Sequence, residues 1–158
     1  MLTTQAFLAL SIACSGKSTP QDTSENVDTS TEDTASELSW SVGLENAPEG
    51  AFLSAWGVSP TDIWVVGGQS DSGVVLRGSQ ATWNSHPTPE GIPLLNWIHG
   101  TAEDDIWTGG LNGTLLHWNG MDWTDHSVDI EEAFWGIYAR SSTDIVAVGG
   151  ESRWGGVQ

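Results

Sequence analysis

Basic residues are scarce in this 158-residue chain. Lys and Arg together number 4 against 21 Asp and Glu, which gives a formal net charge of -17. Proteins that bind nucleic acid or anionic lipid electrostatically neutralise phosphates with a basic patch. The composition therefore excludes nucleic acid as a partner, and it leaves cations, basic proteins or no particular electrostatic partner.

Cysteine and long apolar runs are equally scarce. The chain has 1 Cys, at position 14, so it forms no internal disulfide and its folding must rely on an apolar core. The apolar stretch at 6–13 is too short to span a bilayer.

Catalytic signatures are missing as well. We find no Gly-x-Ser-x-Gly motif, no Ser, His and Asp arrangement and no isolated reactive Cys. The histidines show no close pair at metal-ligand spacing; they are His86, His99, His117 and His126. The sequence thus predicts no catalytic residue, no metal and no cofactor, and it favours a role other than that of an enzyme.

The N-terminal 1–14 segment has an organisation of its own. A brief apolar stretch and small residues lead to Cys14, a pattern that resembles the signal peptide and lipobox of bacterial lipoproteins. The resemblance implies that Cys14 is lipidated and anchors the chain to a membrane. Two positions depart from the family: no Lys or Arg precedes the apolar run, and Ser11 stands where Leu is usual. The alternative is a frayed N-terminus with an unmodified thiol.

Residues 15–37 are rich in Ser, Thr, Asp and Glu, above all from position 18 onward. Such a segment buries too little apolar surface to offset its ordering entropy, so we expect it to be disordered. Behind a lipidated Cys14 it would act as an extended, self-repelling acidic tether. The alternative is a solvated tail with no spacing role.

What the chain does contain is a repeat. Asp62, Asp105 and Asp144 begin three similar segments at steps of 43 and 39 residues, each an apolar run that ends in a Gly pair. This period is typical of propeller blades and of some helical solenoids. Small and apolar residues alternate before each Asp, as in a strand and not in a helix. The repeated units are therefore expected to be β-sheets.

Each unit has the material for four strands. One precedes the Asp and one follows it, a third is expected at 73–77 and 113–117, and a fourth is expected to end at Trp83 or Trp123. The Asn119-Gly120 pair predicts a two-residue hairpin turn. The predicted fold class is all-β, with β-propeller blades of four antiparallel strands in units of about 42 residues.

The region from about residue 38 onward resembles the tryptophan-rich propeller repeats of secreted bacterial proteins. The match is carried by Trp56-Gly57, Asp62-Ile63-Trp64, Gly67, 115–120 and Trp123. The resemblance implies the fold but says little about function, because propellers serve as enzymes, scaffolds and receptors alike.

The resulting domain map places a partial β-propeller at 38–158. It comprises an orphan strand at 38–43, which contains Trp40, followed by blades at 50–87 and 93–127 and a partial blade at 133–158. These elements amount to an incomplete ring. Either the chain is a fragment of a longer protein, or two copies meet head to tail and complete the ring as a homodimer. We favour the fragment.

The repeated Asp62, Asp105 and Asp144 are interpreted as structural turn residues, because a residue needed in every unit is normally structural. Their carboxylates are expected to accept hydrogen bonds from backbone amides of the turn. Most of the 10 Trp recur at strand positions and are expected to pack between blades, with Trp154 the best candidate for a ligand-facing exception.

The sequence therefore predicts a non-catalytic binding or scaffold module. It would be lipid-anchored in a bacterial cell envelope, at the outer membrane or cell surface, and would bind a protein or carbohydrate ligand. The alternative is the N-terminal fragment of a propeller enzyme, a hydrolase or lyase acting on polysaccharide, whose active-site blades are missing.

Overall fold

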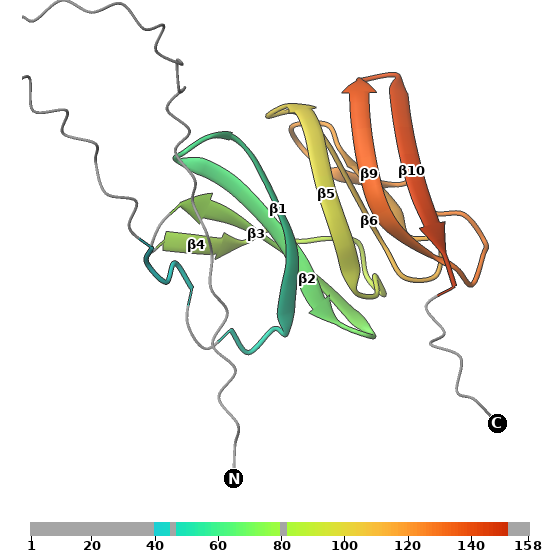
Figure 1. The fold of residues 1–158 in the computed structure, drawn as a ribbon, viewed down its shortest axis with the longest axis horizontal. Coiled ribbons are helices and arrows are strands. Elements are labelled where there is room, and N and C mark those ends of the chain that lie inside the picture. Colours follow the sequence, from blue (N-terminus) through green and yellow to red (C-terminus); the bar gives the residue numbers. More distant parts are fainter. Residues whose placement is uncertain (1–39, 45–46, 80–81, 152–158) are drawn as a thin grey trace, which may run out of the picture.

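The structure is a computed structural model that describes residues 40–44, 47–79 and 82–151. Ten strands form three antiparallel sheets that stand side by side, and the described residues include no helix (Figure 1). The all-β prediction is confirmed at this level. Residues 1–39 and 152–158 lie outside the described residues, so the predictions for Cys14, the 15–37 tether and Trp154 remain predictions.

Each sheet uses consecutive strands in chain order. Sheet 1 comprises β1 (Ala51–Ser59), β2 (Asp62–Gln69), β3 (Ser72–Ser79) and β4 (Thr82–Ser85). Sheet 2 comprises β5 (Leu95–Ala102), β6 (Asp105–Gly110), β7 (Leu115–Trp118) and β8 (Trp123–Asp125). Sheet 3 comprises β9 (Ala133–Ser141) and β10 (Asp144–Gly150). The three repeated Asp thus begin the second strand of each sheet.

The fourth strands differ from the sequence prediction. β8 begins at Trp123 instead of ending there, and Trp83 is the second residue of β4. The Asn119 side chain explains the difference in sheet 2, since its Oδ1 accepts hydrogen bonds from the amides of Met121 and Asp122 and so extends the turn to Asp122. Only Gly120 of the predicted Asn-Gly pair has a positive φ, at 91°.

The first strand of every sheet carries two β-bulges at equivalent places. The extra residues at the first bulge are Leu53, Asn96 and Trp135. Those at the second are Val58, Thr101 and Arg140. A bulge bends its strand and re-aims a side chain. The repetition shows that the three units share their irregularities as well as their strands.

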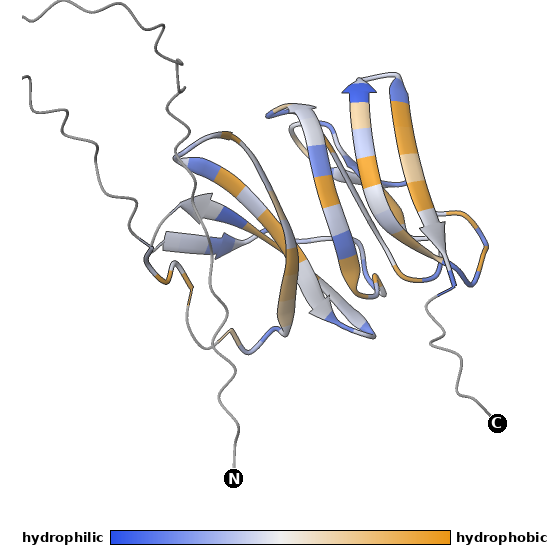
Figure 2. Ribbon diagram, viewed as in Figure 1, coloured by the Kyte–Doolittle hydropathy of each residue, from blue (hydrophilic) through white to orange (hydrophobic). Residues whose placement is uncertain are grey.

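The sheets pack face to face through two apolar clusters. The larger joins Trp64, Val66 and Val75 of sheet 1 to residues of sheet 2 that include Ile106 and Leu116. The smaller cluster joins Trp107 of sheet 2 to Ile137, Ala139, Ile145 and Ala147 of sheet 3. Ile106 and Trp107 are adjacent and point to opposite faces, so sheet 2 is covered on both sides. All six residues of β6 are buried, and Figure 2 shows apolar and polar bands alternating along the strands.

The predicted orphan strand lies partly outside the described residues. Its described part, 40–43, belongs to no strand, so the prediction is corrected for these residues. These residues contact sheet 1 through a side chain and not through strand pairing. The indole Nε1 of Trp83 donates to the Gly43 carbonyl at 2.9 Å. Along the described part of the chain we also find no helix long and apolar enough to cross a bilayer.

Candidate functional site

Asp62 forms an ion pair with the third strand of its sheet. Its two carboxylate oxygens accept from Nε and Nη2 of Arg77 at 2.7 and 2.9 Å, and the guanidinium lies 4.8 Å from the centroid of the Trp64 ring. A bidentate ion pair of this kind fixes the orientation of both the carboxylate and the guanidinium. The hydrogen bonds from Arg77 lower the pKa of Asp62 despite some burial.

Asp105 repeats this arrangement with different chemistry. Its carboxylate contacts Nε2 of His117 at 2.8 Å and accepts a hydrogen bond from the Thr101 hydroxyl, while the His117 ring stacks on Trp107 with centroids 4.3 Å apart. Burial pushes the pKa of Asp105 upward, but the hydrogen bonds from Thr101 and His117 outweigh it and leave the pKa lowered.

We call this arrangement the Asp clamp: a repeat Asp, a third-strand partner and the Trp two residues after the Asp. Its members are Asp62, Arg77 and Trp64 in sheet 1 and Asp105, His117 and Trp107 in sheet 2. The side-chain hydrogen bonds of Asp62 and Asp105 are made with other side chains. The sequence had predicted backbone amides of the turn as their donors.

In sheet 3 the arrangement differs. Asp144 is half exposed and contacts Arg140, near the end of β9, at 3.2 Å, and Val146 stands where the other sheets have Trp.

The Asp105–His117 pair invites comparison with a catalytic dyad, but its equivalent in sheet 1 argues for a structural role. Arg77 fills the same place as His117, and a guanidinium stays protonated in proteins, so it is no general base. Both partners clamp the Asp to the third strand over a Trp ring.

His86 lies at the centre of the aromatic packing between sheets 1 and 2. Its ring centroid is 4.7 Å from Trp64 and 4.5 Å from Trp118, and its Nδ1 accepts a hydrogen bond from Nε1 of Trp123 at 3.2 Å. Burial lowers the pKa of His86, and the charge of Arg77 lowers it further. His86 therefore serves as a neutral acceptor, a role that no sequence motif indicated.

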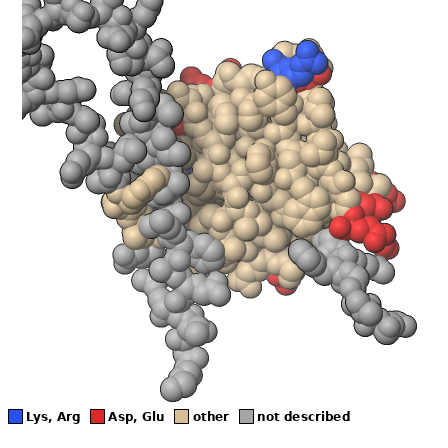
Figure 3. Space-filling view, viewed as in Figure 1, with Lys and Arg blue, Asp and Glu red and all other residues tan. Residues whose placement is uncertain are grey.

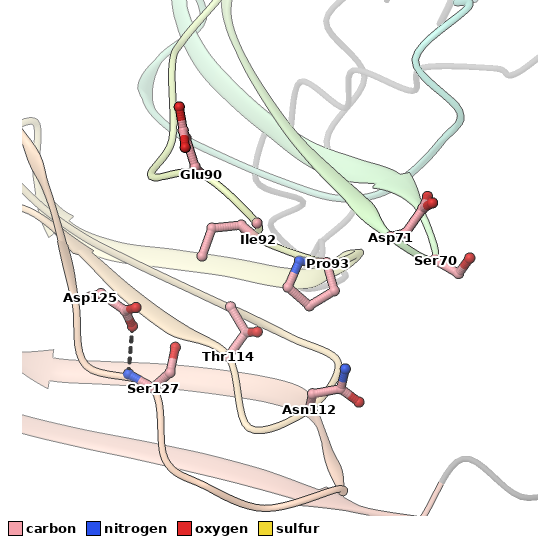
Figure 4. A pocket seen from close by; sticks show the side chains of 10 residues that line it. Ser70, Asp71, Glu90, Ile92, Pro93, Asn112, Thr114, Asp125 and Ser127 are labelled. Carbon is pink, nitrogen blue, oxygen red and sulfur yellow. Dashed lines mark hydrogen bonds between the residues drawn. The ribbon is translucent and has the colours of Figure 1, made fainter.

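A pocket of about 470 Å³ opens where the loops of sheets 1 and 2 meet (Figure 4). Three carboxylates line it from separate segments: Asp71 from the β2–β3 turn, Glu90 from the connection between the sheets, and Asp125 from the end of β8. Its apolar wall consists of Ile92 and Pro93.

The β6–β7 turn contributes one side-chain amide and one hydroxyl to the pocket lining. Asn112 and Gly113 have φ of 53° and 65°, a conformation that places Asn112 and Thr114 on the lining. At Gly113 a Cβ would meet the Val128 carbonyl oxygen at 2.2 Å, so a larger residue would disrupt the turn. Ser127 donates its amide to Asp125 at 2.8 Å, and its hydroxyl and amide together lower the pKa of Asp125.

Within the described ranges, no three His, Cys, Asp or Glu side chains come close enough together to hold a metal ion. The three pocket carboxylates therefore do not form a metal site, and neither do the clamp Asp residues.

Comparison with known proteins returned no matching family model, no matching curated protein and no matching solved structure.

Proposed function

We propose that the chain is a non-catalytic binding or scaffold module built from β-propeller blades and tethered to the bacterial cell envelope. The sheets of antiparallel strands that pack face to face, with repeated bulges and clamps, support the blade assignment. The structural place of His117 supports a role without catalysis.

One observation carries the proposal. The outer face of sheet 3 is exposed, yet it carries apolar residues at positions that are buried between sheets in sheets 1 and 2. Ile145 and Ala147 point toward sheet 2, so the alternating Val146 and Val148 point away. Val146 occupies the place of Trp64, which is 0% exposed, yet Val146 is 47% exposed and Val148 60%. Tyr138, which pairs with Val146, is 59% exposed, but its ring leans toward sheet 2, 5.1 Å from the ring of His99.

A further sheet packed here would cover this face, in the way that sheet 2 covers sheet 1 and sheet 3 covers sheet 2. The occupant that this chain itself offers is the outer face of sheet 1 in a second copy. That face presents Ile63 and Val65, which alternate with the inward Trp64 and Val66. Head-to-tail contact between two copies would extend the stack toward a ring.

Sedimentation velocity on the full chain tests this arrangement. We expect a concentration-dependent dimer that is lost in the Val148→Asp variant and retained in Met121→Asp, which adds the same charge at a residue 79% exposed elsewhere. A folded monomer at every concentration would contradict the assembly of copies. If both variants weakened the dimer equally, the added negative charge alone would explain the loss of dimer.

The envelope location rests on Cys14 and the acidic 15–37 segment. In a bacterial host we expect palmitate labelling of the chain and its recovery with membranes, both abolished by Cys14→Ser. Recovery in the soluble fraction regardless of this change would contradict the lipid anchor.

The ligand is proposed to be a protein or a carbohydrate. Trp97 and Trp135 are exposed on β5 and β9, the contacting first strands of neighbouring sheets. Exposed indoles offer apolar surface that suits both ligand classes, although Nε1 of Trp135 already donates to the Gly150 carbonyl at 3.3 Å. The face over β1, β5 and β9 is also largely free of charged side chains, which lie at its margins (Figure 3).

A further inference from the structure

The chain contains two Asn-Gly pairs, and the structure holds them in opposite ways. Asn112-Gly113 lies in the β6–β7 turn, where Gly113 is buried and its amide donates to the Glu132 carbonyl at 2.7 Å. Asn119-Gly120 lies in the β7–β8 turn, where both residues are exposed. The Gly120 amide has no hydrogen-bond partner among the described residues. The two pairs therefore share a sequence but differ in the availability of the Gly amide nitrogen.

An available amide nitrogen after an Asn is a nucleophile beside an electrophile. It can attack Cγ of the Asn side chain within the same chain, a reaction that benefits from the fixed proximity of the two groups. Gly120 has no Cβ to block the approach, and its φ of 91° is one that Gly adopts without strain. At Gly113, in contrast, the hydrogen bond to Glu132 holds the amide proton in place.

The β7–β8 turn also presents donors to the oxygen on which charge would develop. Oδ1 of Asn119 accepts hydrogen bonds from the amides of Met121 and Asp122, each at 2.9 Å. Addition of a nucleophile to Cγ turns this carbonyl oxygen into an oxyanion, and prearranged backbone donors stabilise an oxyanion more than a neutral carbonyl. Along the described ranges, the side chain of Asn112 receives no such hydrogen bond.

We propose that Asn119 is a site of spontaneous deamidation, promoted by the turn in which it lies. The Gly120 nitrogen attacks Cγ of Asn119 and gives its proton to water, the side-chain amide leaves as ammonia, and a cyclic imide forms. Water then adds to one of the two imide carbonyls. Addition at Cγ gives Asp with an ordinary backbone, and addition at the backbone carbonyl gives isoaspartate, in which the main chain runs through the side chain. This inference is independent of the proposed binding role.

The two products affect the hairpin differently. Asp keeps an oxygen that accepts from the amides of Met121 and Asp122, so it preserves the turn. Isoaspartate inserts a methylene into the backbone between Trp118 and Trp123, which pair across the hairpin and pack with Trp64 in the larger apolar cluster. The isoaspartate form should therefore loosen the contact between sheets 1 and 2, whereas the Asp form should not.

Ageing of the full chain in mildly alkaline buffer, followed by protease digestion and mass spectrometry, tests the proposal. In the folded chain we expect Asn119 to react faster than Asn112 by about tenfold, the factor that one backbone hydrogen bond at the protected pair provides. In urea both pairs should react at similar rates, because Gly follows Asn in each. Asn119 should react at least as fast in the folded chain as in urea, since the two amide donors are prearranged only in the folded turn.

Variants assign the modification and its effect. Asn119→Gln should abolish the acidic species that ion exchange resolves from the aged chain, because the longer side chain would have to close a larger ring. Asn84→Gln, a matched change at an exposed position in β4, should leave that species in place. Asn119→Asp supplies the ordinary Asp product and should unfold at the same urea concentration as the native chain. The purified isoaspartate form should unfold at a lower urea concentration.

Three results would overturn the inference. Equal rates at the two pairs in the folded chain would show that the Gly amides are equally available. Slower reaction of Asn119 in the folded chain than in urea would show that the turn protects it. An isoaspartate form as stable as Asn119→Asp would show that the hairpin absorbs the added methylene. A chain that stays monomeric yet deamidates at Asn119 would contradict the proposed assembly of copies but not this modification.

Discussion

At the scale of single residues, the clamp Asp is held by whatever donor the third strand supplies. Arg77 offers a permanent charge and two donors to Asp62, whereas His117 offers one ring nitrogen to Asp105 and depends on Thr101 for a further hydrogen bond. Both partners lie against a Trp ring, at Trp64 and Trp107 respectively. The clamp therefore requires a planar, donor-bearing side chain more than it requires a particular residue.

The lowered pKa of Asp62 makes the stability of the fold depend on acid. Because the folded pKa lies below the unfolded one, the contribution of Asp62 is complete above the unfolded pKa of about 4 and declines as pH falls below it. Urea unfolding followed by Trp fluorescence should show this decline in the native chain. It should be shallower in Asp62→Asn, and an unchanged slope would contradict the role of the clamp.

His86 should add a second dependence at higher pH. Burial lowers its folded pKa, so its contribution is complete above the unfolded value of about 6.5 and declines as pH falls below it. We expect the free energy of unfolding to decrease between about pH 7 and pH 5, and His86→Gln to remove much of that decrease. His126→Gln, at an exposed histidine, should leave the decrease in place.

At the scale of elements, the energy of the fold lies in the contact between sheets. Trp64 is fully buried between sheets 1 and 2, while Trp97 on β5 is exposed. Trp64→Ala should lower the free energy of unfolding by about 3–5 kcal/mol. Trp97→Ala should change it by about 0.5 kcal/mol or less. Chemical denaturation of both variants compares them directly, and similar losses would show that the packing is misassigned.

The strands were predictable because their signals are local. The Asp and the Gly pair bracket β2, β6 and β10, and the alternation before each Asp indicates the preceding strand. The repeated bulges were not predictable, since Leu53, Asn96 and Trp135 share no residue type and take their place from pairing with the second strand. The buried Nδ2 of Asn96, which donates to the Phe134 carbonyl at 3.0 Å, shows the long-range contact behind one of them.

The candidate pocket was hidden from sequence for a similar reason. Asp71, Glu90 and Asp125 belong to different segments and fit no spacing pattern, so only the stacking of two sheets brings them together. Residues 112–114 form a turn with positive φ at Asn112 and Gly113, and the place of this turn in the pocket lining depends on the neighbouring sheet.

At the scale of the whole molecule, charge opposes the proposed contact between copies. Each chain carries a net charge of -17, while the outer face of sheet 3 is apolar at Val146 and Val148. Salt screens repulsion between chains but does not weaken apolar burial. The dimer should therefore strengthen as salt rises from about 0.01 M to about 0.15 M. Sedimentation at the two salt concentrations measures this, and weakening by salt would indicate a contact made by ion pairs instead.

The two covered faces of sheet 2 have a consequence for how such a chain changes size. One face of this unit fits the unit before it and the other fits the unit after it. A tandem duplication of the middle unit would keep both of these contacts and add one new interface, in which the face that fits sheet 3 in one copy meets the face that fits sheet 1 in the other. Lengthening by gene duplication therefore preserves two contacts and requires one new one, whereas loss of the middle unit removes both contacts and brings together two faces that do not meet in this structure.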